Sequence, residues 1–279
     1  MECVIRDTPI YYEVYGTGMP IISLHGYTPD HRLMKGCMEP LFAEHSGWQR
    51  IYLDLPGMGR TPGQEQINST DDMLDLVVDF IDQLLPGQHF LLAGESYGGY
   101  LSRGVVWRKF EQVEGIALIC PAVVASSVQR DLPLHAVIVE NPQLLASLDP
   151  VDAEEFSSMA VVQDAYNWER FRDEILSGLR VADQAFLQKL RPIYSFSFDV
   201  DQLPQPFSKP VVIFTGRQDS AVGYRDVWRL LEHYPRGTFA VLDRAGHNAH
   251  IEQSQLFNAL MGEWLDRVQE ALQQSYALR

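Results

Sequence analysis

His89-Phe90-Leu91-Leu92-Ala93-Gly94-Glu95-Ser96-Tyr97-Gly98-Gly99-Tyr100-Leu101 is the stretch of sequence that decides the fold. The apolar run 90–93 predicts a buried strand. The pattern G-x-S-x-G over 94–98 predicts a sharp turn that carries Ser96, and a helical pattern follows it. Such a turn holds the Ser96 hydroxyl at the C-terminal edge of a sheet, beside the free amides and positive dipole end of a helix.

Strands and helices alternate along most of the chain, which predicts an α/β fold: a mostly parallel central sheet flanked by helices. After a hairpin formed by 4–5 and 10–15, short apolar strands are expected at 21–24, 50–53, 90–93, 115–120, 210–215 and 238–242. Helices are expected at about 32–45, 70–84, after Ser96, and at about 224–233 and 254–273. The inner side of the last helix is predicted to carry Leu256, Leu260, Trp264, Leu265 and Val268.

The strand rhythm stops between residues 122 and 207. Only 136–139 resembles a buried strand there, and helices are expected at 152–164, 168–179 and 183–190. We interpret 122–207 as a helical cap, or lid, inserted into a core domain made of 1–121 and 208–279.

Length and charge restrict the class of protein. A chain of 279 residues fits one large α/β domain with an insertion and can bury a sizeable core. The net charge of -15 argues against a nucleic-acid partner, because phosphates would be repelled. No signal peptide is visible and no apolar stretch approaches the roughly 20 residues that span a bilayer, so we expect no membrane partner.

The cysteines suit neither a disulfide framework nor a zinc site. Cys3, Cys37 and Cys120 lie far apart and are odd in number, so they are interpreted as free thiols in a reducing cytoplasm. No nucleotide, flavin or metal motif occurs, and no cofactor or metal is expected. We expect a monomer or homodimer that acts on a small molecule.

Three polar residues lie just past predicted strand ends: Ser96, Asp219 and His247. The carboxyl ends of parallel strands form the ligand crevice of an open sheet, so these side chains are expected to meet there. A serine hydroxyl needs an imidazole to take its proton, and the imidazole needs a carboxylate to fix its tautomer. Their order along the chain is the one expected with a nucleophile turn.

Other residues compete for two of these roles. The rivals for the acid are Asp54, Asp243 and Glu252, of which Asp54 is interpreted as holding its Pro/Gly loop. Among the histidines, His25 is interpreted as a brace for the loop after strand 21–24, and His250 as a structural residue near His247.

With these motifs, nearly the whole chain resembles the α/β-hydrolase family. The matching pieces occur in family order and are His25-Gly26, Asp54-Leu55-Pro56-Gly57-Met58-Gly59, Gly94-Glu95-Ser96-Tyr97-Gly98-Gly99, Gly216-Arg217-Gln218-Asp219 and Ala245-Gly246-His247. The resemblance implies Ser96 as nucleophile, His247 as base and Asp219 as orienting acid. It also implies an oxyanion hole made by the backbone amides of Tyr27 and Tyr97.

Two departures from the patterns of the wider family limit the subgroups and reactions that the chain resembles. There is no His-Gly-Gly-Gly run, so the chain does not resemble the lipase subgroup that carries it. The nucleophile position holds Ser96, not Asp, which disfavours haloalkane dehalogenase and epoxide hydrolase chemistry.

The predicted function is hydrolysis of a small carboxylic ester through an acyl-enzyme. Alternatives on the same fold are a carbon–carbon bond hydrolase, a lactonase, an aminopeptidase or a non-catalytic ligand receptor. Candidate substrate contacts in the cap are Trp168, Phe171, Tyr194 and Phe196, with packing inside the cap as the other interpretation. Arg103 and Arg191 are interpreted as solvated, with binding of a substrate carboxylate as the alternative.

Overall fold

An eight-stranded sheet forms the centre of the protein in a computed structural model, which describes residues 1–277. Its strands are β1 (Glu2–Ile5), β2 (Thr8–Tyr15), β3 (Met19–Leu24), β4 (Trp48–Leu53), β5 (Phe90–Glu95), β6 (Val113–Ile119), β7 (Val211–Gly216) and β8 (Gly237–Leu242). They lie in the order β1-β2-β4-β3-β5-β6-β7-β8. The pairs β1–β2 and β2–β4 are antiparallel, and all the others are parallel, which confirms the predicted hairpin and parallel sheet.

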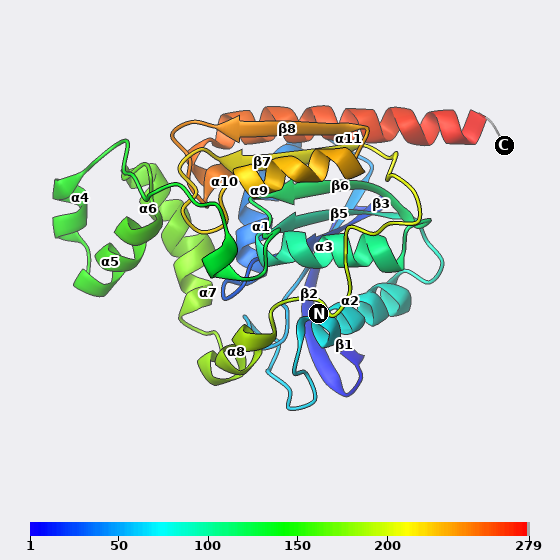
Figure 1. Ribbon diagram of the computed structural model, residues 1–279, viewed down its shortest axis with the longest axis horizontal. Helices are drawn as coiled ribbons and strands as arrows, with labels where there is room; N and C mark the ends of the chain where they lie inside the picture. The colour runs from blue at the N-terminus through cyan, green and yellow to red at the C-terminus, as the bar shows by residue number, and fades with distance from the viewer. Residues whose placement is uncertain (278–279) are drawn as a thin grey trace.

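Helices cover both faces of this sheet. One face carries α2 (Thr70–Leu84), α3 (Tyr97–Arg108) and α9 (Arg225–Trp228), and the other carries α1 (His31–Met38) and α11 (Ser254–Ala277), as Figure 1 shows. α10 (Ala249–Glu252) immediately precedes α11. No helix within residues 1–277 combines the length and the apolar character needed to cross a membrane.

Several helices differ from their predicted extents or faces. The helix predicted at 152–164 ends at Met159, and the one predicted at 224–233 is α-helical to Trp228 and continues as a 3-10 turn, Arg229–His233. The helix predicted at 32–45 ends at Met38 and continues as a 3-10 turn, Glu39–Ala43, because Pro40 has no N–H for the α-helical ladder. On α11, Leu256 is 49% exposed, so its predicted inward position is wrong. The buried stripe of α11 follows helical spacing from the next residue and comprises Phe257, Met261, Trp264, Leu265 and Val268.

Packing is tight where β5 turns into α3. β5 is buried along its whole length between β3 and β6, and α3 starts directly after Ser96. A Cβ atom at Gly98 would lie 2.0 Å from the carbonyl oxygen of Leu24 on β3. A Cβ atom at Gly94 would lie 2.4 Å from the carbonyl oxygen of Gly98. Glycine at these two positions therefore lets helix and strand pass at contact distance.

The segment 122–207 adds no strand to the sheet within the described residues. Its helices are α4 (Pro142–Ser147), α5 (Pro150–Met159), α6 (Ala165–Phe171), α7 (Ser177–Leu179) and α8 (Gln184–Leu190), with a π-helical turn, Arg172–Leu176, joining α6 to α7. Figure 1 shows α4 to α7 beyond the arrowheads of β5 to β8, and α8 at the lower left of the view. The strand-like run 136–139 makes only an isolated bridge between Val139 and Val162, and the six-residue α4 was not predicted.

The division into a core and a cap stays a prediction. Two of its core residues, 278 and 279, lie outside the part of the chain that the structure describes.

The close approach at Gly98 can be tested by adding one methyl group. We expect Gly98→Ala to lower the free energy of unfolding by about 2–3 kcal/mol, because the new Cβ meets a backbone carbonyl that cannot rotate away. Gly262→Ala on α11 is the control, since its Cβ would meet only the His45 ring, at 3.1 Å. That control should change stability by less than about 1 kcal/mol in denaturant unfolding. Equal stability of both variants would contradict the packing argument.

Candidate active site

Ser96 lies in a strained backbone conformation at the end of β5. Its φ is 51°, a left-handed value that is uncommon for a residue with a Cβ atom. Three backbone hydrogen bonds hold it there. Its N–H donates to Ile119 O at 2.9 Å, and its carbonyl accepts from Tyr100 N at 3.1 Å and Ala122 N at 3.0 Å. The turn predicted from G-x-S-x-G is therefore fixed by both neighbouring elements, α3 and the end of β6.

Ser96, His247 and Asp219 form one hydrogen-bonded chain across three strand ends. His247 Nε2 lies 3.0 Å from Ser96 Oγ, and His247 Nδ1 lies 2.9 Å from Asp219 Oδ2. Ser96 follows β5, Asp219 follows β7 and His247 follows β8. The structure thus brings together the three side chains that the sequence places at strand ends.

Asp219 is fully buried, and its second oxygen is also occupied. Asp219 Oδ1 accepts from the backbone N–H groups of Ala221 at 2.9 Å and Val222 at 3.0 Å. Burial alone would raise the pKa of Asp219, but the charge of His247 and these hydrogen bonds outweigh it and lower that pKa. The carboxylate is therefore ionised and unable to rotate, which suits an acid that orients an imidazole.

Glu95 is a site residue that the sequence-based candidates do not include. It is 2% exposed, and its Oε1 lies 3.3 Å from His247 Nε2, the nitrogen that contacts Ser96. Burial raises the pKa of Glu95 to about 7, with Asp219 adding to this shift and His247 and the Gly26 N–H opposing it. Its position next to Ser96, at the buried end of a strand, was the available signal in the sequence.

The imidazole of His247 lies between these two carboxylates. Burial lowers its pKa, but the charges of Asp219 and Glu95 and the hydrogen bond to Asp219 together raise it to about 9. The site therefore stabilises the imidazolium, and the neutral imidazole that can accept a proton from Ser96 is the favoured form only above about pH 9.

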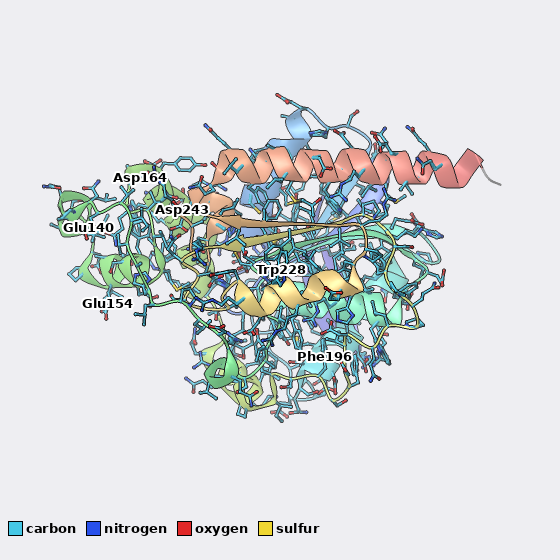
Figure 2. The ribbon with its side chains drawn as sticks, turned by 45° about the horizontal axis from the view of Figure 1, so that its top comes forward. Glu140, Glu154, Asp164, Phe196, Trp228 and Asp243 are labelled. Atoms are coloured by element: carbon cyan, nitrogen blue, oxygen red, sulfur yellow. The ribbon has the colours of Figure 1, made fainter. Side chains whose placement is uncertain are left out.

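The three rival acids lie in other environments. Asp54 is buried and accepts from the backbone N–H groups of His31 and Arg60, both at 2.8 Å. Asp243, labelled in Figure 2, is exposed and accepts from Gln218 Nε2 at 2.9 Å.

Glu252 braces the loop of His247. Its carboxylate accepts from Gly246 N at 2.6 Å and from Val161 N at 2.6 Å and Val162 N at 3.1 Å. These bonds tie the residue before His247 to the segment after α5.

The two other histidines near the site have structural surroundings. His25 is buried; its Nε2 accepts from Leu55 N at 3.0 Å, and its Nδ1 lies 2.7 Å from Gly26 O. It links the loop after β3 to the loop after β4, in agreement with the predicted bracing role. His250 is also buried, and neither ring nitrogen has a hydrogen-bond partner within the described residues.

Tyr27 and Tyr97 flank Ser96 from two sides. Tyr97 is the first residue of α3, so its amide belongs to the unpaired N–H groups of a helix start. Tyr27 follows Gly26, where an added Cβ would lie 3.2 Å from the Ser96 Cβ. The two rings meet edge to face with centroids 5.4 Å apart. The oxyanion role of their amides stays a prediction.

A cavity of about 740 Å³ opens onto Ser96 and His247. Its lining is formed by Tyr27, Thr28, Ser96, Ala125, Ser126, Ser127, Arg130, Met159, Arg191, Pro192, Tyr194, Ser195, Ala221, Val222 and His247. Of the four aromatic residues proposed from the sequence, Tyr194 alone belongs to this lining. Much of the remaining lining is polar and comes from irregular segments of 122–207, for which no periodic signal exists.

The other three aromatic residues pack among hydrophobic neighbours. Phe156 contacts both Trp168, at 5.5 Å between ring centroids, and Phe171, at 5.4 Å. Phe196 packs on Tyr100 at 4.3 Å and lies far from Glu140 and Glu154 of the predicted cap (Figure 2). These side chains bury apolar surface, so the structure places them outside the cavity lining.

The two arginines also differ from each other. Arg103 is 1% exposed and forms an ion pair with Asp201, which contradicts its predicted solvated position. Arg191 is exposed and lines the cavity.

Two groups of donor atoms lie close enough to share a metal ion: Cys120, Asp219 and His247, and Asp30, His31 and Asp54. In each group the imidazole Nδ1 is already hydrogen-bonded to a carboxylate, Asp219 in one and Asp54 in the other. These bonds occupy atoms that an ion would need, so neither group argues for a metal.

Comparisons with known proteins bear on the fold and the family of the chain. A family model described as "Alpha/beta hydrolase family" matches residues 21–260. A pimeloyl-[acyl-carrier protein] methyl ester esterase of Legionella pneumophila (strain Corby) is 24% identical, covering 92% of this chain and 99% of its own. One from Shewanella woodyi is 25% identical, covering 94% and 99%. The crystal structure of an alpha/beta superfamily hydrolase from Oenococcus oeni PSU-1 is 31% identical, with a TM-score of 0.86 and coverage of 96% and 99%.

The effect of Glu95 on His247 is directly measurable. Glu95→Gln keeps the shape of the side chain and removes its charge 3.3 Å from His247 Nε2. We expect the pKa of His247 to fall by about one unit or more, since a nearby opposite charge favours the protonated imidazole. An NMR titration of the His247 ring measures this value.

Asp243→Asn is the control for this titration, because it removes an exposed carboxylate whose side chain bonds Gln218. It should leave the His247 titration where it is in the unaltered protein. An unchanged titration in Glu95→Gln would contradict the coupling.

Proposed function

The chain belongs to the alpha/beta hydrolase family, and we propose that it is a serine esterase that cleaves a small carboxylic ester through an acyl-enzyme. The observation that carries this proposal is the hydrogen-bonded chain from Ser96 Oγ through His247 to Asp219 at the floor of the cavity. Esterase activity is favoured over the other reactions of the fold because the relatives from Legionella and Shewanella are named as methyl ester esterases.

In the first half of the reaction, Ser96 Oγ attacks the ester carbonyl carbon while its proton passes to His247 Nε2. The distance of 3.0 Å between these atoms supports this transfer. The tetrahedral intermediate then expels the alcohol oxygen, which takes the proton from His247. Asp219 keeps Nδ1 protonated, so that Nε2 is the nitrogen that exchanges protons throughout.

In the second half, water replaces the alcohol. His247 Nε2 removes a proton from the water as it attacks the acyl carbon, and returns that proton to Ser96 Oγ when the acid leaves. The backbone N–H groups of Tyr27 and Tyr97 donate to the oxyanion in both halves. Fixed donors of this kind stabilise charge as it develops and need no reorientation during the reaction.

We further propose that 122–207 is a cap that selects the substrate. Cavity-lining side chains from this segment include Ser126, Arg130, Met159, Arg191 and Tyr194. The chemistry would then lie at the strand ends, and the shape and charge of the cavity would come from the cap.

The nucleophile can be tested with a fluorophosphonate probe. We expect labelling of the unaltered protein at Ser96 and none in Ser96→Ala, because an activated serine is the group that the probe requires. Ser195→Ala, which changes another serine of the same cavity, should still be labelled. A labelled peptide other than that of Ser96 would refute the assignment.

The acid can be tested by removing its charge. In trypsin-like enzymes, changing the triad Asp to Asn costs about 10⁴ in kcat, and we expect Asp219→Asn to lose at least about 10². Asp243→Asn should lose far less, because its exposed carboxylate bonds Gln218 and not His247. Initial rates with a short-chain ester, on variants whose circular dichroism matches the unaltered protein, measure this difference. Greater inactivation by Asp243→Asn would place the acid elsewhere.

A further inference from the structure

The cavity above Ser96 has a charge opposite to that of the whole protein. The chain carries a net charge of -15, yet the charged side chains that line this cavity, apart from His247, are two arginines, Arg130 and Arg191. Within the described residues no aspartate or glutamate belongs to the lining. A positive cavity in an acidic protein attracts an anion to a place where the rest of the surface repels it.

Arg130 is held rigidly by neutral groups. Its Nε donates to Val124 O at 2.8 Å, Nη1 donates to Ala221 O at 2.8 Å, and Nη2 donates to Ala125 O at 3.2 Å. A guanidinium has five N–H groups, so one on each Nη remains for a further acceptor. Carbonyl groups fix its direction without neutralising it, and no ion pair to Arg130 occurs within the described residues.

The positive charge of Arg130 acts electrostatically on His247. It opposes the rise in the pKa of His247 to about 9 that Asp219 and Glu95 cause. A cation that acts on His247 also acts on an anion bound in the same cavity, because both share a partly dehydrated space in which charges interact strongly.

Arg191 supplies a second guanidinium to the cavity from another segment of 122–207. It begins the 3-10 turn Arg191–Ile193 after α8, and its backbone N–H donates to Leu187 O. Its guanidinium has neither a hydrogen bond nor an ion pair with any residue of the described chain and lines the cavity. Burial raises the pKa of Tyr27 to about 12, and the charge of Arg191 opposes this shift, which places the guanidinium within electrostatic reach of the Ser96 side of the cavity.

We propose that Arg130 and Arg191 bind an anionic oxygen group of the substrate, so that the preferred esters also carry a carboxylate or phosphate. Each planar guanidinium can donate two parallel N–H groups to such oxygens. Ser126, Ser127 and Ser195 line the same cavity and provide hydroxyl donors for the remaining lone pairs. This inference rests on the proposed esterase function and specifies its substrate class.

The test compares esters that differ in one charge. Monomethyl adipate is the carboxylate probe, methyl hexanoate and dimethyl adipate are its neutral partners, and the methyl ester of 5-phosphonopentanoic acid is the phosphate-like probe. We expect kcat/KM for at least one anionic ester to exceed that of the neutral esters by about tenfold, as a charge-assisted hydrogen bond would give. The faster of the two anionic probes identifies the anion.

Arg191→Gln should lower this preference about threefold, chiefly through KM, because Arg130 remains in the cavity. Arg191→Lys should retain part of it, because a lysine keeps the charge but not the forked geometry. The control is Arg180→Gln, which changes an exposed cap arginine paired with Asp152 outside the cavity and should leave the preference intact. Raising the salt concentration should weaken the preference of the unaltered protein, since the interaction is ionic.

Arg130→Gln is unsuitable as the first variant, because Arg130 also holds the Ala221 carbonyl beside Asp219. Fluorophosphonate labelling of Arg191→Gln reports on the triad independently of the charge of the ester. Equal kcat/KM for charged and neutral esters, or an equal loss for both in Arg191→Gln, would overturn the anion subsite and leave the esterase proposal standing. Failure of all esters together with failure of the probe to label Ser96 would overturn both proposals.

Discussion

The main chain at Ser96 is the constraint on which the site depends. Ser96 has a Cβ atom and still occupies a left-handed conformation, because three backbone hydrogen bonds hold it. Their partners are Ile119 at the end of β6, Tyr100 in the first turn of α3, and Ala122. Helix and sheet can support this geometry only at contact distance, which requires glycine at 94 and 98. The Ser96 hydroxyl therefore lies at the C-terminal edge of the sheet, where the loops that carry Asp219 and His247 leave β7 and β8.

The electrostatics of the site follow from burying three titratable side chains together. His247 has Asp219 on one ring nitrogen at 2.9 Å and Glu95 near the other at 3.3 Å. Of these two carboxylates, Asp219 has two backbone donors on its free oxygen, whereas Glu95 is opposite the nitrogen that must exchange protons with Ser96. The pKa of Asp219, which accepts these hydrogen bonds, is lowered, whereas the pKa of Glu95 is raised.

The segment 122–207 is attached to the triad loops through backbone groups. Glu252 joins Val161 and Val162 to the residue before His247, and Arg130 joins Val124 and Ala125 to the loop after Asp219. In both connections an ionisable side chain, of Glu252 or Arg130, forms hydrogen bonds with neutral backbone groups. The segment that lines the cavity is therefore mechanically connected to the base and to the acid, and a change in one is expected to affect the other.

Sequence alone determined the parallel sheet, the turn at Ser96 and the positions of Asp219 and His247 at strand ends. These features follow from local causes: apolar runs that must be buried, glycines that permit a tight turn, and the convergence of parallel strands at one edge. Tertiary structure alone decided which side chains face the cavity. Trp168, Phe171 and Phe196 turned away into apolar packing, Arg103 became buried against Asp201, and Glu95 came to lie beside His247. In irregular segments no period links a residue to a face, so the direction of each side chain depends on contacts with residues distant in the sequence.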